Sequence, residues 1–455
     1  MKNKVLEFIN EFIKKLKTAA DFTAEDFRLV ADYTESLSLG QKENELLGPY
    51  NMPSISKDLS ASLYVIWKDK RISNVNLNYE TINNFESEIA NWKKNSYKDE
   101  FAPSVWREEE FDNDDVLTYK MRDEKIEKIV AGDAAPLFEA INLINSELKP
   151  YSKLLSAGGG ASVTRRLIYV GAEAEKPNYD FTFTMCAVYF NLDNIYRDSY
   201  FKRRIFNTAD LNKLINKAKQ FYPHFSKKAE IETVNKNPAA GLDNIILTPD
   251  VADSFIKKYV MPNIYGSSVV ERQSKFSIDE FRSQEKVFRD DISFKFCYDS
   301  DEYDINNIPV SYEGVYGKPV YFIKNGKLQT PVLDLKYSKK AEMPPTAYLD
   351  SRTFQSGEYS LKIETNEYEE MENIISDLSN GYIVFTVLGM HTQDHTSGNF
   401  SLSSPYALKI SDGKIEGLCK ISISGNFFDI LNHSNTKFLN WYSEGDTMAF
   451  KCHCS

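Results

Sequence analysis

Residues 389–402 read GMHTQDHTSGNFSL, and residues 406–426, a short way further on, read YALKISDGKIEGLCKISISGN. The second stretch places β-branched and aromatic residues on both sides of Asp412-Gly413, a dipeptide typical of a tight hairpin turn. The pattern recurs through this half of the chain, so we expect a mainly antiparallel β domain. Its expected strands are residues 318–323, 382–388, 406–410 and 415–423, and its expected turns are Asn325-Gly326, Asp412-Gly413 and Gly425-Asn426.

The N-terminal half contains both apolar residues at helical spacing and strand-like stretches. Apolar residues at helical spacing predict helices at residues 5–16, 24–39, 81–92, 134–148 and 209–221. Strand-like text predicts a hairpin of residues 61–67 and 72–77 around residues 68–71, and further strands at residues 165–170 and 181–185. Gly158, Gly159 and Gly160 precede the first of these further strands, and we expect them to form a flexible turn because no Gly-Lys-Ser/Thr follows them.

The length of 455 residues exceeds what one hydrophobic core usually organises, so two or three domains are expected. Residues 106–115 carry too much like charge to pack and predict a solvated linker. We therefore predict an α+β fold: an N-terminal α/β domain at residues 1–110, a central α+β domain at residues 111–225, and a β-rich C-terminal domain at residues 226–455. One helix, Pro249 to Val260, is expected near the start of the last domain.

The composition excludes several classes of partner. A formal net charge of -11 opposes the counterion release on which nucleic-acid binding depends, so nucleic acid is not expected as a ligand. No apolar stretch approaches the roughly 20 residues of a membrane span, and the N-terminal helix is amphipathic and lacks the apolar core of a secretion signal. Five cysteines are too few for a disulfide framework in a chain of this length. A reducing cytoplasm is the expected compartment.

The stretch Gly389 to Leu402 resembles the Gly-x-His-Thr-x-Asp-x-x-Ser-Gly-x-Phe-Ser-Leu signature of TldE/PmbA-type proteins, which belong to the TldD/PmbA family. Three further segments resemble the family in the same order. They are Glu313-Gly314-Val315 with residues 322–328 (FIKNGKL), residues 406–413 (YALKISDG) and residues 421–429 (ISISGNFFD). The N-terminal half resembles the family only in size and element order.

The resemblance implies a division of labour between two chains. The catalytic, TldD-like chain of the family carries His-Glu-x-x-x-His on a helix, where two histidines and a distal cysteine hold zinc and the Glu can serve as general base. Here the corresponding helix is Pro249 to Val260, Lys257 and Lys258 stand about where His-Glu would be, and no His is followed by Glu anywhere in the chain. A protonated Lys has no lone pair for a metal. The resemblance therefore implies a non-catalytic subunit that holds no cofactor and pairs with a TldD-like subunit containing zinc, and the family's older association with DNA gyrase modulation is a further hint.

The residues 391–401 supply the candidate site. We expect a polar loop there that shapes a groove for an extended peptide or contacts the partner subunit, formed by His391, Thr392, Asp394, His395, Ser397, Gly398, Phe400 and Ser401. A hydrogen bond between His391 and Asp394 could fix this loop.

Two other arrangements remain open as metal sites. His391, Asp394 and His395 would share one face if they were helical, and Cys452-His453-Cys454 places two thiols on one face of a final strand, although neither set completes a tetrahedral site by itself. The alternatives to a peptide-processing subunit are thus an independent metallopeptidase with an atypical site and a structural or regulatory homodimer.

Overall fold

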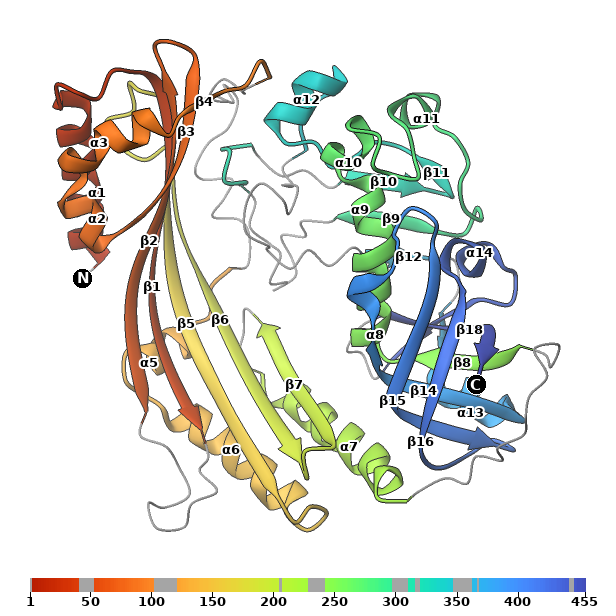
Figure 1. Ribbon diagram of the computed structural model, residues 1–455. Helices are drawn as coiled ribbons and strands as arrows, with labels where there is room; N and C mark the ends of the chain where they lie inside the picture. The colour runs from red at the N-terminus through yellow and green to blue at the C-terminus, as the bar shows by residue number, and fades with distance from the viewer. Residues whose placement is uncertain are drawn as a thin grey trace. The chain divides into compact units, whose positions relative to one another are not determined.

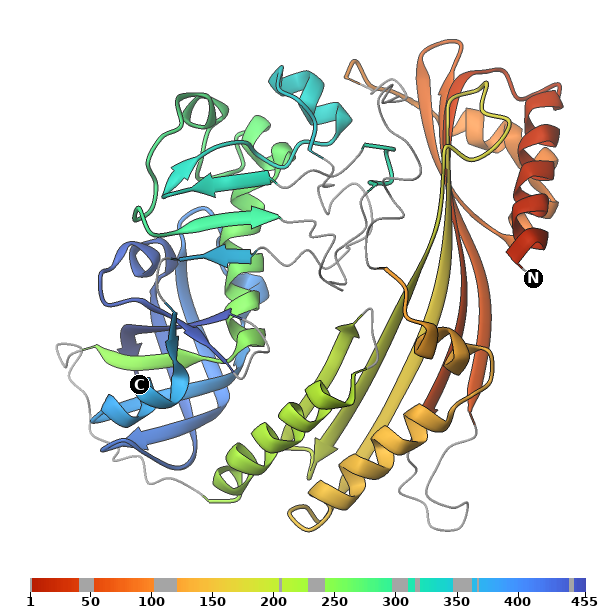
Figure 2. The ribbon, with the colours of Figure 1, turned by 180° about the vertical axis from the view of Figure 1, so that it is seen from behind.

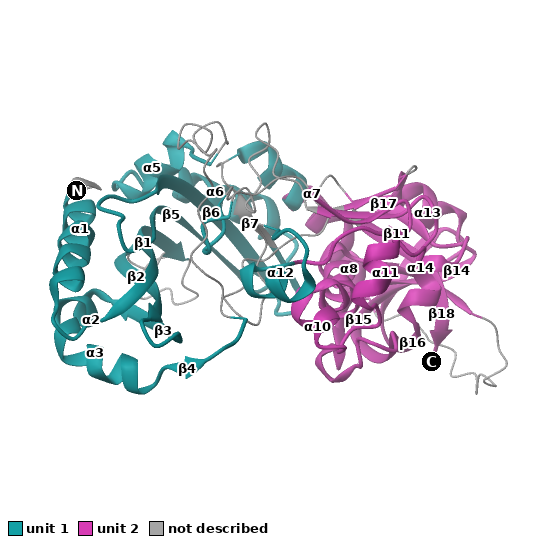
Figure 3. Cartoon of the chain, turned by 90° about the horizontal axis from the view of Figure 1, so that it is seen from above, with its two compact units in different colours: residues 1–214, 298–318, 333–349 teal, residues 215–297, 319–332, 350–455 magenta. Residues whose placement is uncertain are grey.

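The computed structural model describes residues 2–40, 53–101, 121–203, 207–227, 242–296, 310–315, 320–346, 362–365, 368–441 and 446–455. The predicted linker at residues 106–115 lies outside these ranges. The chain forms two compact units (Figure 3). The first unit comprises residues 1–214, 298–318 and 333–349, and the second comprises residues 215–297, 319–332 and 350–455. The three-domain division stays a prediction.

The first unit is built on a seven-stranded antiparallel sheet with the order β4-β3-β2-β1-β5-β6-β7 (Figure 1). Its strands are β1 (Ala24–Gly40), β2 (Ser54–Trp67), β3 (Arg71–Asn78), β4 (Tyr97–Lys98), β5 (Leu155–Val170), β6 (Tyr179–Leu192) and β7 (Tyr196–Arg203).

The helix predicted at residues 24–39 is wrong, because these residues form the central strand β1. Phe27, Leu29 and Ala31 alternate with Arg28 and Val30, and only the first three belong to the core beneath the N-terminal helices. This period of two is the strand signal, and pairing with β2 on one side and β5 on the other satisfies the backbone along nearly the whole strand.

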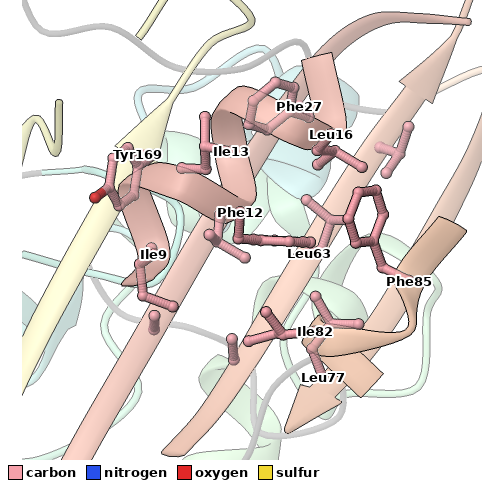
Figure 4. Packing of buried hydrophobic residues seen from close by; sticks show 14 of the residues in the cluster. Ile9, Phe12, Ile13, Leu16, Phe27, Leu63, Leu77, Ile82, Phe85 and Tyr169 are labelled. Atoms are coloured by element: carbon pink, nitrogen blue, oxygen red, sulfur yellow. The ribbon is translucent and has the colours of Figure 1, made fainter. Parts of the chain in front are cut away.

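Helices cover one face of this sheet. Helix α1 (Lys2–Thr18) confirms the predicted amphipathic helix, and the helix predicted at residues 81–92 is split into α2 (Tyr79–Asn83) and α3 (Phe85–Lys94). Ile9, Phe12 and Leu16 of α1 pack with Phe27, Leu63 and Phe85 in one buried cluster (Figure 4). Helices α5 (Glu124–Val130) and α6 (Ala135–Leu148) pack on β5 and β6.

The triple glycine does not form a turn. Gly158, Gly159 and Gly160 lie inside β5, paired with β1 and β6 on either side. A Cβ on Gly159 would lie 2.9 Å from the carbonyl oxygen of Ala187 on β6 and 3.3 Å from a methyl of Leu137 on α6. Gly159 therefore allows the backbone of β6 to approach β5 closely. The predicted flexible turn is wrong.

Two later segments return to the opposite face of the sheet. Glu313, in residues 310–315, lies with Oε1 3.9 Å from Nη1 of Arg28 on β1, and both side chains are buried. The backbone N–H of Leu335, the first residue of α12 (Leu335–Ala341), donates to Oε2 of Glu313 at 2.8 Å. Burial raises the pKa of Glu313 to about 7, since Arg28 offsets only part of the cost of burying the carboxylate. Burial likewise lowers the pKa of Arg28.

The second unit is dominated by a ring of five strands, shown from two sides in Figure 1 and Figure 2. The ring closes because β18 pairs with both β16 and β8, and β17 and β13 extend it outward. Its strands are β8 (Asp243–Leu247), β14 (Asn380–Leu388), β15 (Asn399–Ser411), β16 (Lys414–Asn426), β17 (Lys437–Asn440), β18 (Asp446–Cys454) and β13 (Tyr368–Glu370). A smaller sheet has the order β11-β10-β9-β12, with β9 (Ser293–Phe296), β10 (Val320–Lys324), β11 (Lys327–Leu328) and β12 (Lys362–Glu364).

The α+β class and the mainly antiparallel C-terminal sheet are confirmed, since only β13–β17 and β8–β14 run parallel among the described strand pairs of this unit. The hairpin turns at Asn325-Gly326 and Asp412-Gly413 are confirmed as well. The turn predicted at Gly425-Asn426 is wrong: Gly425 pairs with Phe400 inside the β15–β16 ladder, and Asn426 then caps α14 (Phe427–Asn432).

The helix predicted at residues 249–260 is longer and less regular than expected. It consists of α8 (Pro249–Phe255), a π-helical turn (Ile256–Val260) and α9 (Met261–Ile264), and α10 (Gly266–Val270) and α11 (Ile278–Ser283) follow. The other helices of this part are α7 (Thr208–Phe225), which runs from the first unit into the second, and α13 (Met371–Asp377). No helix among the described residues is long and apolar enough to cross a membrane.

Candidate functional site

The predicted site is a loop between β14 and β15 in the second unit. It leaves β14 at Gly389, which has φ +92°, passes through a 3-10 turn at Met390–Thr392, and enters β15 at Asn399. Gly398 has φ +76°, and a Cβ there would lie 2.3 Å from the ring of Phe428. Glycines at both ends thus permit a backbone path that other residues rarely adopt.

The loop is ordered by its own polar groups. Asp394 accepts hydrogen bonds from Oγ1 of Thr396 at 2.8 Å, from the backbone N–H of Thr396 at 3.0 Å, and from that of Ser397 at 3.3 Å. These hydrogen bonds, led by the Thr396 hydroxyl, lower the pKa of Asp394 to about 2, so the carboxylate is ionised at neutral pH. Asp394 therefore closes a turn with the residues that follow it, Thr396 and Ser397, and this turn orders the loop in place of the possible pair with His391.

Two residues that the sequence analysis missed cross-link the loop. The side chain of Gln393 donates to the carbonyl of Gly389 at 2.9 Å and accepts from the N–H of Ser401 at 3.1 Å. The side chain of Asn426 on β16 donates to the carbonyl of Ser397 at 2.8 Å. Gln393 lies within the signature and Asn426 within the segment 421–429 that also resembles the family, and these positions were the available signal.

The candidate residues divide into two groups. His391, Thr392, Asp394, Ser397 and Ser401 are exposed, and His395 is half-buried with Nε2 3.0 Å from the carbonyl of Gln273. Phe400 and Gly398 are buried, and the ring of Phe400 packs edge-on against Phe255 of α8 at 5.2 Å. The loop thus presents polar side chains outward and anchors its C-terminal end in the core.

Three side chains of the preceding helix reach the main chain of the loop. Nζ of Lys258 lies 3.4 Å from the carbonyl oxygen of His391. The hydroxyl of Tyr259 donates to the carbonyl of Asn399 at 3.1 Å, and the amide of Asn263 donates to the carbonyl of His395 at 2.8 Å. The side chains of Tyr259 and Asn263 are fully buried.

Residues 241–441, which include this helix and loop, match the PmbA/TldA metallopeptidase C-terminal domain. These residues belong to the TldD/PmbA family as its C-terminal domain. A zinc metalloprotease TldD homolog of Saccharolobus solfataricus is 24% identical over 233 residues, which are 50% of this chain and 49% of that protein, so the match spans about half of each.

Two solved structures share the fold over nearly the whole chain. TldE from Thermococcus kodakarensis has a TM-score of 0.67 at 18% identity, covering 98% of each chain. A Thermotoga maritima protein, whose name associates it with DNA gyrase modulation, has a TM-score of 0.70 at 17% identity, covering 98% of this chain and 100% of its own. Most of the residues that match the family's C-terminal domain, 241–441, lie in the second unit.

The helix in which the resemblance led us to expect the zinc motif, residues 249–264, contains no histidine. Counted from Lys258, the positions i, i+1 and i+5 of a His-Glu-x-x-x-His motif are Lys258, Tyr259 and Asn263. None of the three fits a zinc ion: a protonated Lys lacks a lone pair, burial raises the pKa of Tyr259, and Asn263 is committed to main-chain partners. Lys257, the other expected counterpart, pairs with Asp253 at 2.7 Å on the surface.

The terminal Cys-His-Cys lies on β18, with β16 between it and the loop end of β15, since Ser424 pairs with His453 on one side and with Ser401 on the other. Cys452 is buried, and burial raises its pKa to about 12, which disfavours the thiolate that a metal requires. Cys454 is half-buried, while His453 is exposed. In the part of the chain that the structure describes, no three His, Cys, Asp or Glu side chains are grouped as metal ligands would be.

Proposed function

We propose that this chain is the non-catalytic, TldE/PmbA-like subunit of a two-component TldD/TldE-type metallopeptidase that processes or degrades extended peptides. The observation that carries the proposal is the helix expected to hold the zinc motif: it contains no histidine, and its Lys258, Tyr259 and Asn263 bond to the loop instead. A TldD-like partner would supply the zinc ion and the bond cleavage. The free, buried thiols of Cys419 and Cys452 are compatible with a cytoplasmic location for the pair.

The chemistry of these three residues supports a subunit without its own cleavage step. Zinc hydrolysis needs imidazole or thiolate ligands to hold the metal, and a carboxylate that takes the proton from the metal-bound water. Counted from Lys258, Tyr259 takes the second position of the motif, and burial raises the pKa of its phenol, which therefore stays protonated. Its hydroxyl donates a hydrogen bond to the carbonyl of Asn399, and a protonated phenol is no general base for water.

The contribution of this chain would then be recognition. The exposed side chains of His391, Thr392, Asp394, Ser397 and Ser401 offer hydrogen-bond donors and acceptors to a peptide or to the partner subunit. Beside them, β14 pairs with β8 only as far as Val384, and Leu388 at its end is 56% exposed. We propose that an extended peptide adds as a strand near this end of β14, where main-chain hydrogen bonds give affinity and the loop contributes specificity.

Co-expression tests this function. This chain and a TldD-like chain from the same genome would be purified separately and together, then compared by size-exclusion chromatography and by cleavage of an unfolded, fluorescent casein. We expect a single complex that cleaves the substrate, while neither chain alone does so. Separate elution under all salt conditions, or cleavage by this chain alone, would contradict the proposal.

A further inference from the structure

Side chains of the helix bond to main-chain carbonyls of the loop at intervals of four residues. The acceptors are the carbonyls of His391, His395 and Asn399, each four residues after the last. The donors, Lys258, Tyr259 and Asn263, all come from one helical stretch. We infer that these three side chains form a clamp that positions the loop.

The π-helical turn explains how the donors reach one loop. In a regular α-helix, residues five apart point about 140° away from each other. A π-turn bonds residue i to residue i+5, as the N–H of Met261 does with the carbonyl of Ile256, and so brings such positions toward one face. Pro262 supplies the cause, because it has no N–H to donate to the carbonyl of Lys258 and its ring would crowd that carbonyl.

Asn263 is the centre of the clamp. Its Nδ2 donates to the carbonyls of Tyr259 and His395, both at 2.8 Å, while its Oδ1 accepts from the N–H of Lys275 at 2.5 Å. All of these partners are backbone atoms, so the side chain joins helix, loop and the segment after α10 without using any loop side chain. A buried amide satisfied in this way fixes one geometry and is costly to disturb.

The clamp should help the loop to bind a peptide or the partner subunit, and this step rests on the proposed function. Because it grips carbonyls only, the side chains of His391, Asp394 and Ser397 stay exposed on a backbone that is already ordered. A peptide or partner subunit that binds them does not have to order the loop, and this saving strengthens binding. Lys258, Tyr259 and Asn263 are thus positioning residues, which act through the loop.

Hydrogen exchange on the whole isolated chain tests the clamp directly. Tyr259→Phe removes one hydroxyl and leaves the ring, and Asn263→Asp keeps the acceptor for Lys275 while removing the donor to His395. We expect amide exchange across residues 390–398 to accelerate about three- to tenfold in each variant, the effect of losing one hydrogen bond. Tyr382→Phe, a buried tyrosine on β14, is the matched control and should leave the loop unchanged. Unchanged loop protection in both clamp variants would overturn the inference.

A second measurement separates positioning from simple stability. In the complex with the TldD-like chain, Tyr259→Phe and Lys258→Met should raise KM for the fluorescent casein several-fold with kcat unchanged, and Lys258→Arg should restore the wild-type KM. An unchanged KM would show that the clamp does not serve recognition. If the wild-type chains do not associate at all, the proposed function fails, whereas the exchange experiment still decides whether the clamp exists.

Discussion

His391 and Asp394 are neighbours in the signature, but they differ in what they do for the fold. Only the carbonyl of His391 is held by another element, and its imidazole is exposed. The carboxylate of Asp394 bonds to Thr396 and Ser397. Stability and recognition can therefore be separated within one loop.

We expect His391→Ala to leave the melting temperature unchanged and to lower casein cleavage by the complex. Asp394→Ala should lower the unfolding free energy by about 1 kcal/mol, since it removes a local turn, and should also lower cleavage. His453→Ala, another exposed histidine of the same unit, is the control and should affect neither quantity. Thermal unfolding and turnover measured on the same preparations decide this, and full activity in both loop variants would remove the loop from the site.

Glu313 is the residue whose titration should be visible near neutral pH. Its pKa is about 7 in the folded chain against an ordinary 4.5, so the folded chain binds the proton more tightly than the unfolded chain. The contribution of Glu313 to stability is therefore full below pH 4.5 and is lost as the pH rises through about 7.

We expect the unfolding free energy of the wild-type chain to fall between these pH values relative to Glu313→Gln, with a slope of up to about 1.4 kcal/mol per pH unit. Urea unfolding at constant ionic strength measures the difference between the two chains. Parallel pH profiles would show that Arg28 compensates the buried carboxylate fully.

At the scale of whole elements, sequence patterns predicted best where a local signal and the tertiary environment agree. Helix α1 has its apolar face and its charged face in sequence, and the hairpins at Asn325-Gly326 and Asp412-Gly413 have their turn residues. By contrast, β1 was mistaken for a helix although Phe27, Leu29 and Ala31 alternate, because its apolar residues also satisfy a helical spacing in part.

The site, too, could be predicted from the sequence only in part. The loop around Asp394 could be located from its signature, and the absence of His-Glu could be read from the chain. The clamp could not, because it depends on a π-turn and on contacts between residues more than 130 positions apart, such as Tyr259 and Asn399. Spacing alone does not show which carbonyl a lysine, tyrosine or asparagine will meet.

The triple glycine of β5 offers a test of close packing in the sheet. A Cβ at Gly159 would meet the Ala187 carbonyl at 2.9 Å, whereas the nearest atom to a Cβ at Gly160 is the Leu37 carbonyl oxygen at 3.4 Å. We expect Gly159→Ala to lower the unfolding free energy by about 1 to 3 kcal/mol through overpacking, and Gly160→Ala to change it by less than about 1 kcal/mol in either direction. Urea denaturation of both variants checks this, and equal effects would show that β6 shifts freely.

For the whole molecule, the two units are related to known proteins in different ways. The match to the family's C-terminal domain covers residues 241–441, within the part of the chain that holds the loop and the clamp. The seven-stranded sheet of the first unit lies outside that range, and there the likeness in hand is that of fold, which the two solved structures share over 98% of this chain. Function is therefore argued from the second unit, and pairing with another chain has to be tested on the full chain.

The zinc content of this chain and of its complex tests the proposed non-catalytic role most directly. A ligand that binds only the folded state stabilises it, so a chain that depends on zinc loses stability when the metal is removed. The described residues hold no cluster that fits a metal, and Lys258, Tyr259 and Asn263 are engaged with the loop. We expect no stoichiometric zinc in this chain alone, and a melting temperature that a chelator does not change.

In the complex we expect one zinc per pair of chains, located in the TldD-like subunit. A chelator should abolish casein cleavage while this chain keeps its melting temperature and stays associated, because its side of the assembly would not depend on the metal. Elemental analysis of each chain and of the complex, with and without chelator, measures this. One zinc per copy of this chain, lost in His391→Ala or in Cys454→Ser, would instead assign the metal to the loop or to the last strand and make this chain a metalloprotein in its own right.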